Sequence, residues 1–364
     1  MSDFGRIPRQ TVPTIRFSGS PVHNMLCSLC LLNQDHLDHI SPWVDEMLGR
    51  ITPEEKASAK KACEAGIYAG DTRAANIAEF ARELRGREPR TLLQTRYGHL
   101  RQKALAKLPR ETVPAVDSII GDRETYLDLA RRLTESYDDE FNRDEAVEEY
   151  EWMADTEAYR DEIADTIEHF WSVYLRDEWD RVREAVDDSV GALSSVVLRG
   201  GLEERLKYVT GRDYIPEMWL EMLRDAREIV YVPSVHIGPY MILFDFDGTR
   251  AFIVGRAHIP EGSRVHSARL DHSELLMRLD ALSDSTRLRI LELAAHEGTI
   301  TTQQIMDALE LSQSSASRHL TQLAATGLLT VDGSERTKRY GVNPRRVDSV
   351  CDALRHLVAP PKRG

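Results

Sequence analysis

The sequence contains no run of about 18 consecutive apolar residues, so no transmembrane helix is expected. Its first ten residues, MSDFGRIPRQ, lack the apolar core of a secretory signal peptide. Cysteine is rare, because Cys27, Cys30, Cys63 and Cys351 are the only four in 364 residues, and they are too scattered for a disulfide framework. These absences predict a cytoplasmic protein with reduced thiols and no membrane partner.

The sequence also has neither an internal repeat nor a low-complexity block. What it has is length: 364 residues, of which 41% are hydrophobic, can form two or three domains with cores of their own. The formal net charge of −13 is uneven, because residues 275–364 hold 12 Lys and Arg against 10 Asp and Glu, whereas residues 1–274 hold 35 against 50. The acidic excess belongs to the N-terminal part, so the C-terminal part can contact an anionic partner.

Residues 311–327, LSQSSASRHLTQLAATG, have the pattern of a helix that can enter the DNA major groove. Ser312 is the expected N-cap, and small or hydrogen-bonding side chains fill the first half of the helix. Apolar residues recur behind them at helical spacing, and Gly327 stands where a left-handed C-cap is easiest. A shorter helical segment with a capping threonine, TTQQIMDALE (301–310), precedes this helix. The pair indicates a helix-turn-helix.

Residues 328–342, LLTVDGSERTKRYGV, are expected to form two strands around a polar, basic tip. At this tip Arg336, Lys338 and Arg339 can reach phosphates. A basic cluster of this kind can be no more than a solvated surface. Its place directly after a helix-turn-helix favours a wing that contacts the DNA backbone.

With these elements in this order, residues of about 270–357 resemble the winged helix-turn-helix domain of the ArsR/SmtB family of bacterial transcriptional regulators. The phrase LDALSDSTRLRILELA (279–294) is similar to the opening helices of that family. SQSSASRHLTQLAATGLL resembles its recognition helix and strand entry, and RRVDSVCDALRHL resembles its last, dimerising helix. The resemblance covers about a quarter of the chain.

The resemblance implies a homodimeric, sequence-specific DNA-binding regulator, in the simplest case a repressor, whose partners are double-stranded DNA and a second copy of the chain. Two-fold symmetry would place two recognition helices about 34 Å apart, so half-sites should lie roughly 10 base pairs apart. Arg318 is best suited to guanine because its donors are paired. The residues expected to contact bases or phosphates are Thr302, Ser312, Gln313, Ser314, Ser315, Ser317, Arg318, His319, Arg336, Lys338 and Arg339.

Many members of this family sense metals, which the resemblance places at two sites. One site uses cysteines before the recognition helix, and the matching stretch here, ITTQQIMD, has none. The other uses Asp and His of the final helix, where this chain offers His356 with Asp348 or Asp352, an incomplete set. His356 and Cys351 are more simply interpreted as dimer-face residues. We therefore expect no metal and no cofactor.

The N-terminal part begins with a possible strand, TIRFS (14–18), followed by three helix starts. Ser20-Pro21 and Ser41-Pro42 each place a capping serine before a proline, and TPEEK at 52–56 forms a capping box. From there to about residue 210 the pattern is nearly all helical. This includes the acidic segment 135–188, whose aromatic and aliphatic residues still recur at helical intervals.

The period then changes to that of strands. Residues 228–234, 239–248 and 249–256 have strand patterns, and Asp247-Gly248 is a strong hairpin turn between the last two. HIPEGSRVHS (258–267) fits a linker because of its Pro, Gly and Ser.

We therefore predict a mainly α fold with a small β component: a helical N-terminal domain plus short antiparallel strands, followed by a C-terminal winged helix-turn-helix. The N-terminal domain, residues 1–260 with a β-hairpin near 228–256, would serve an effector or dimerisation role. The DNA-binding domain would cover residues 268–364. An effector would change the spacing of the two DNA-binding domains.

The stretch LFDFDGT (243–249) matches the opening motif of haloacid-dehalogenase-type phosphatases, in which the first Asp is the nucleophile and the second the acid/base. In that family the motif ends a buried parallel strand and leads into a loop and helix. Here TRAFIVGR returns at once as a strand, and about 25 residues remain before the winged helix. The sequence favours a hairpin over a phosphatase site.

Cys27 and Cys30 form a CxxC with His23, His36 and His39 nearby, which allows a metal- or thiol-responsive sensor as an alternative function. Two small core residues are the simpler interpretation, because free cysteine packs like a hydrophobe and no second CxxC follows.

The role of the N-terminal domain is open among three possibilities. Trp171, Tyr174, Trp179 and Trp219 suggest a small-molecule effector bound between helices, although ordinary core packing is the simpler explanation for them. An enzyme fused to a winged helix would need a catalytic constellation, and we find none in the sequence, so no enzymatic activity is expected. A protein-docking module would use the acidic face, with binding that fades in salt.

Overall fold

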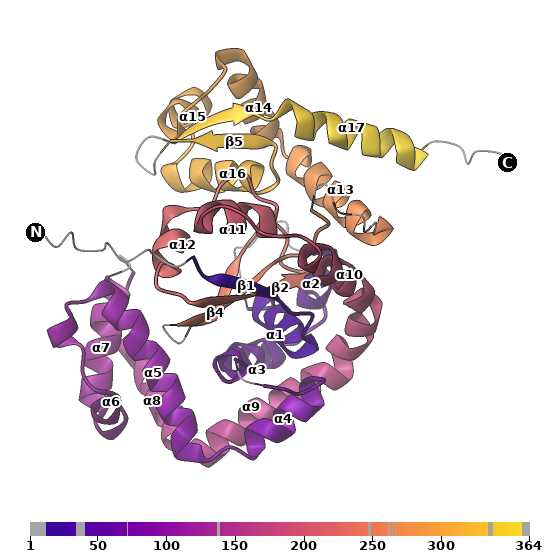
Figure 1. Cartoon of the computed structure of the whole chain (residues 1–364). Helices are drawn as coiled ribbons and strands as arrows, with labels where there is room; N and C mark the ends of the chain where they lie inside the picture. The colour runs from indigo at the N-terminus through magenta and orange to yellow at the C-terminus, as the bar shows by residue number, and fades with distance from the viewer. Residues whose placement is uncertain are drawn as a thin grey trace, which may run out of the picture.

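The computed structural model describes residues 12–33, 41–70, 72–136, 139–246, 249–260, 263, 265, 267–333 and 338–358. We refer to described residues up to 260 as the body and to residues 268–358 as the head. Figure 1 shows the helices of the body wrapped around a small sheet, with the head on one side of it. The mainly α class with a small β component is confirmed.

Three of the first helices of the body start where local signals in the sequence place them. Ser20 and Ser41 cap helices with proline at their first turn, and Thr52 forms the capping box with Glu55, as the sequence predicts. The first helices are α1 (Pro21–Leu31), α2 (Pro42–Leu48), α3 (Pro53–Ala62), η1 (Cys63–Tyr68), α4 (Ile77–Arg85), α5 (Pro89–Lys107), η2 (Arg110–Thr112), α6 (Val116–Gly121) and α7 (Arg123–Glu135). They are followed by α8 (Arg143–Ala154), α9 (Thr156–Phe170), η3 (Trp171–Leu175), α10 (Arg176–Ser194), α11 (Leu202–Thr210) and α12 (Glu217–Met222).

The sheet of the body is mixed, which corrects the expectation of antiparallel strands. Its strands are β1 (Thr14–Phe17), β2 (Glu228–Ser234), β3 (Ile242–Phe246) and β4 (Arg250–Arg256), in the order β1-β2-β4-β3. Only the β3–β4 pair is antiparallel, whereas β2 is parallel to both β1 and β4. The reason is topological: the chain reverses twice between β2 and β4, and β3 takes the edge instead of the space between them.

The β3–β4 pairing also bears on the phosphatase-like motif. Phe246 pairs with Ala251, so the chain returns as a strand directly after the motif, as expected for a hairpin. Asp247-Gly248, the expected turn, lies outside the described residues. Asp245 stands in an edge strand and not at the end of a buried parallel strand.

The head has the element order of a winged helix. Its elements are α13 (Ala268–Ser283), α14 (Ser285–Glu297), α15 (Thr302–Leu309), α16 (Gln313–Ala325), β5 (Leu329–Asp332), β6 (Arg339–Val342) and α17 (Pro344–Val358). β5 and β6 pair antiparallel, and a bridge between Ile300 and Tyr340 ties them to the start of α15. Their core is formed by head residues alone, such as Ile290, Ile305 and Leu323.

Among the described residues no helix is both long and apolar enough to cross a lipid bilayer. The hydrophobic cores of the body lie between its helices and on the sheet, and each is formed by residues up to 259. Figure 1 shows α16 at the side of the head that faces α11 and α12 of the body. The arrangement places the predicted recognition helix next to the body.

Candidate nucleic-acid interface

The turn between α15 and α16 is set by caps on both helices. Thr301 and Gln304 form a capping box at the start of α15. Glu310 then adopts a left-handed conformation, with φ 56°, which ends α15. The side chain of Ser312 accepts a hydrogen bond of 3.2 Å from the backbone N–H of Ser315, so α16 begins where the sequence places it. The predicted helix-turn-helix is confirmed.

The inner face of α16 is apolar and buried. Ala316, Leu320 and Leu323 are at most 1% exposed and pack in the core of the head. The first half of the outer face is exposed and polar, and the structure brings four predicted residues together there: Gln313, Ser314, Ser317 and Arg318. Ser312 is exposed beside them, Ser315 is half-buried, and Thr302 is half-buried at the start of α15.

His319 is placed differently from the prediction. Its side chain is 8% exposed, and Nδ1 lies 3.9 Å from Oδ1 of Asp284, the N-cap of α14. The sequence contained the signal for this, because position 319 lies three residues after Ala316 and four before Leu323, on the same side of the helix. His319 therefore joins α16 to α14 instead of facing a ligand.

The basic residues of the wing have contacts of their own. The guanidinium Nε of Arg339 donates a hydrogen bond of 3.0 Å to Oγ1 of Thr299 at an exposed site. Nζ of Lys338 lies 5.3 Å from the ring centre of Tyr214, which belongs to the body. Arg336 lies outside the described residues.

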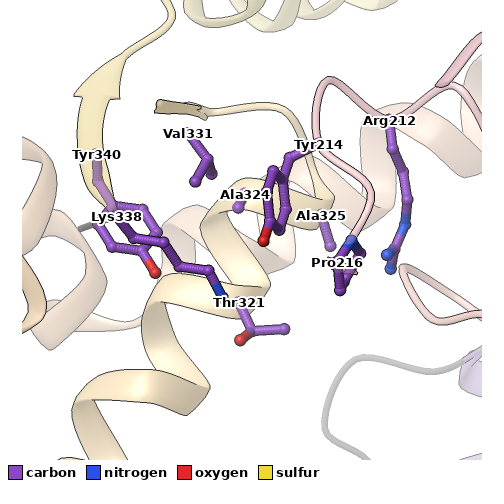
Figure 2. A pocket seen from close by; sticks show the side chains of 9 residues that line it. All are labelled: Arg212, Tyr214, Pro216, Thr321, Ala324, Ala325, Val331, Lys338 and Tyr340. Atoms are coloured by element: carbon purple, nitrogen blue, oxygen red, sulfur yellow. The ribbon is translucent and has the colours of Figure 1, made fainter. Parts of the chain in front are cut away.

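The contact between Lys338 and Tyr214 belongs to a larger contact surface between the body and the recognition helix. A cavity of about 80 Å³ lies where the segment between α11 and α12 meets α16 and the wing. Figure 2 shows Tyr214 among side chains of both head elements. The lining residues are Arg212, Tyr214 and Pro216 of the body, Thr321, Ala324 and Ala325 of α16, and Val331, Lys338 and Tyr340 of the wing.

Two further observations extend this contact. Nδ2 of Asn343, after the wing, donates a hydrogen bond of 3.4 Å to Oδ2 of Asp213. A Cβ added to Gly327 would come within 3.6 Å of the same carboxylate oxygen. The segment 212–216 therefore contacts the second half of α16 and the base of the wing. No motif in the sequence indicated this contact.

A second connection between body and head runs through charged residues of α13. Arg256, at the end of β4, lies 3.7 Å from the carboxylate of Glu274, and Arg278 donates to the same carboxylate. Burial would raise the pKa of Glu274, but Arg256 and Arg278 lower it, and its net pKa lies below the ordinary value. Nε of Arg278 donates to the carbonyl of Thr326 at the end of α16. Glu274 is therefore a charged link between the body sheet and the recognition helix.

The cysteine pair has the features of packing residues. Cys27 is fully buried, and burial raises the pKa of its thiol to about 12, so the reactive thiolate is disfavoured. Cys30 is half-buried, and His36 and His39 lie outside the described residues. In the part of the chain that the structure describes, no group of three or more His, Cys, Asp or Glu side chains is placed to hold a metal ion.

The other predicted ligand features are also spread out. Trp171 belongs to the helical core of the body, whereas Trp219 packs in a different core against the sheet. The four aromatic residues therefore do not surround one cavity. In α17, Asp352 forms a 2.7 Å ion pair with Arg355, and the side chain of His356 lies outside the described ones.

The comparisons with known proteins agree with the architecture of the head. Residues 282–332 match the family described as "Helix-turn-helix domain". The chain is 48% identical over 77 residues to the arsenic resistance transcriptional regulator ArsR1 of Pseudomonas putida, a match that covers 21% of this chain. The chain spans 60% of the length of that relative. No solved structure matches the chain.

Proposed function

We propose that this chain, in which a long N-terminal region precedes an ArsR-type helix-turn-helix, is a sequence-specific DNA-binding transcriptional regulator. The observation that carries the proposal is the exposed, polar first half of α16, held in place by a buried apolar face. The similarity to a transcriptional regulator over 77 residues supports it. This similarity supports a regulatory role and not a catalytic one. We propose that the protein acts in the cytoplasm.

In this proposal α16 enters the major groove by its first two turns. Arg318 donates paired hydrogen bonds to guanine, while Gln313, Ser314 and Ser317 contact neighbouring bases or phosphates. Arg339 gives a salt-dependent contact with the backbone, together with Arg336 and Lys338. His319 is left out because it is buried.

We further propose that the regulator is a homodimer and a repressor. Leu357 and Val358 at the end of α17 are 59% and 78% exposed. A second copy of the chain would bury such side chains. The operator would then be an imperfect palindrome with half-sites roughly 10 base pairs apart.

We also propose that the N-terminal part, residues 1–260, is an effector or partner-responsive domain that controls the DNA-binding domain, residues 268–364. The contact of segment 212–216 with α16 supports this. A duplex that follows the recognition helix to the wing would have to occupy the space that Tyr214 and Pro216 fill. Movement of the body away from α16 would then precede or accompany DNA binding.

The test is a selection of bound duplexes from random-sequence DNA by the full chain at low salt. We expect one palindromic sequence to be enriched, and Arg318→Ala to relax the preference at one position of each half-site. Arg289→Ala is the matched control, because Arg289 is an exposed arginine of α14 in the same head. Enrichment of no sequence, or equal effects of the two variants, would contradict sequence-specific binding by α16.

Repression and dimerisation have separate readouts. The enriched palindrome placed over a reporter promoter should lower expression when the chain is present, and raised expression would identify an activator. Sedimentation of the full chain should show a dimer that Leu357→Asp weakens.

A further inference from the structure

A second and larger cavity, of about 340 Å³, lies between the body and α13 of the head. Its apolar lining includes Trp43 at the start of α2, Val182 of α10, Val235 after β2 and Leu276 of α13. A volume of this size falls in the range of small-molecule sites, about 300–1,000 Å³, and is too small for a helix of a partner protein. Leu276 is 44% exposed, so the cavity leaves part of this apolar side chain in contact with water.

One wall of the cavity is fixed by a chain of buried polar contacts. The indole ring of Trp43 stacks on the ring of His236, with centroids 4.8 Å apart and planes 24° apart. His236 contacts the carboxylate of Glu178 at 2.5 Å and Oγ of Ser28 at 2.7 Å, and its side chain is 1% exposed. These contacts hold the ring of Trp43 in its place in the wall of the cavity.

This series of polar contacts continues to Arg181, a cation at the rim of the cavity. Arg181 donates two hydrogen bonds, of 2.7 and 2.5 Å, to Glu178, whose side chain is 3% exposed. Arg181 lines the cavity and is 61% exposed at its side chain, and His272 of α13 adds an imidazole ring to the lining.

We propose that this cavity binds a small aromatic carboxylate, with its ring between Trp43 and Leu276 and its acid group at Arg181 and His272. The apolar lining matches a flat hydrocarbon ring, and the few polar groups at one end match a single acidic group that sets its orientation. This inference rests on the proposed function in one respect only, namely that the ligand is an effector of DNA binding.

The location of the cavity explains how a ligand could act on the head. His272 and Leu276 of α13 line it, whereas Glu274 and Arg278 of the same helix join Arg256 of the body to the end of α16. A ligand ring inserted between Trp43 and Leu276 changes the position of α13 relative to the body. Since α13 carries the charged link to α16, the position of the recognition helix relative to the body changes as well.

The experiment is a calorimetric titration of the full chain with 1-naphthoate, and with 1-naphthalenemethanol as its uncharged counterpart. We expect the acid to bind with a Kd on the order of 0.1 mM, and the alcohol to bind at least several-fold more weakly. Leu276→Glu should weaken the acid at least tenfold, because it places a carboxylate against the ring and near the acid group. The matched control is Leu288→Glu, since Leu288 of α14 is 43% exposed and lies outside the cavity lining.

Three outcomes would overturn the inference. If neither probe binds, the cavity is not a binding site. If the two glutamate variants weaken binding equally, the ligand does not bind next to Leu276. Equal affinity for acid and alcohol contradicts the proposed chemical class. These readouts do not involve DNA, so they can fail while DNA binding by α16 stands, and they can succeed while DNA binding fails.

Discussion

Tyr214 of the body is the residue whose removal tests most directly whether the body restrains DNA binding. Its ring lies under Nζ of Lys338 at 5.3 Å and lines the cavity formed with α16. Tyr214→Ala deletes both contacts but leaves the head unchanged. We expect the variant to bind its operator more tightly than the parent chain.

The magnitude follows from the two contacts that are lost. A cation–π contact at a partly exposed site is worth about 0.5–1 kcal/mol. Loss of the apolar part of the ring from the contact adds roughly 1 kcal/mol at about 25 cal/mol per Å². We call the form in which segment 212–216 contacts α16 closed, and the form in which the body has moved away from α16 open. At about 1.4 kcal/mol per factor of ten, the closed form becomes about ten- to thirtyfold less favoured. The apparent Kd falls by up to this factor if the closed form dominates in the parent chain.

The assay is fluorescence anisotropy of a labelled operator duplex at fixed salt, with two controls. Tyr214→Phe keeps the ring and should leave the Kd unchanged. Tyr208→Ala removes a tyrosine of α11 that is not part of the cavity lining and should also have no effect. An unchanged or raised Kd for Tyr214→Ala would refute the idea that segment 212–216 competes with DNA.

Three further measurements test the DNA surface and the fold. Arg339→Ala should reduce the slope of log K against log salt by about one, because one phosphate contact is lost; an unchanged slope would remove Arg339 from the interface. Ser312→Ala should cost about 1 kcal/mol of stability through loss of the N-cap, seen as a lower Tm, whereas Ser314→Ala should cost little. Burial lowers the pKa of His258 from 6.5 to about 3, so the unfolded chain binds a proton at this residue more readily than the folded chain does. The free energy of unfolding is therefore unaffected by His258 above pH 6.5 and falls as the pH falls toward 3, by at most about 1.4 kcal/mol per pH unit. Melting curves at pH 7 and pH 5 should show this loss, and His258→Asn should reduce the difference; an equal loss in that variant would assign it to other groups.

Local features of this chain could be predicted from the sequence because their causes are local. The caps at Ser20, Ser41, Thr52 and Ser312 depend on side chains within three residues, and all four form as expected. The head could be predicted for a second reason: several such signals occur in a fixed order.

Long-range pairing could not be predicted in the same way. The joining of β1 to β2 brings together residues more than 200 positions apart, and neither strand carries a signal for its partner or its direction. The contact of Tyr214 with Lys338 is of the same kind, because a tyrosine in a loop has no periodicity to indicate which surface it meets.

The two contacts between body and head have different consequences, although both reach the recognition helix. Segment 212–216 covers α16 directly, so DNA and the body compete for one surface. The cavity at Leu276 has none of the lining residues of that surface, and in our proposal a ligand there acts by changing the relative stability of the closed and open forms. Linkage then fixes the relation between the two sites: a ligand that weakens DNA binding by some factor must itself be bound more weakly, by the same factor, when DNA is present. Since Tyr214→Ala shifts the same equilibrium toward the open form, it must reduce this coupling as well, and a ligand effect that is unchanged in that variant would mean that the cavity and the DNA surface are joined by some route other than closure of the body on α16.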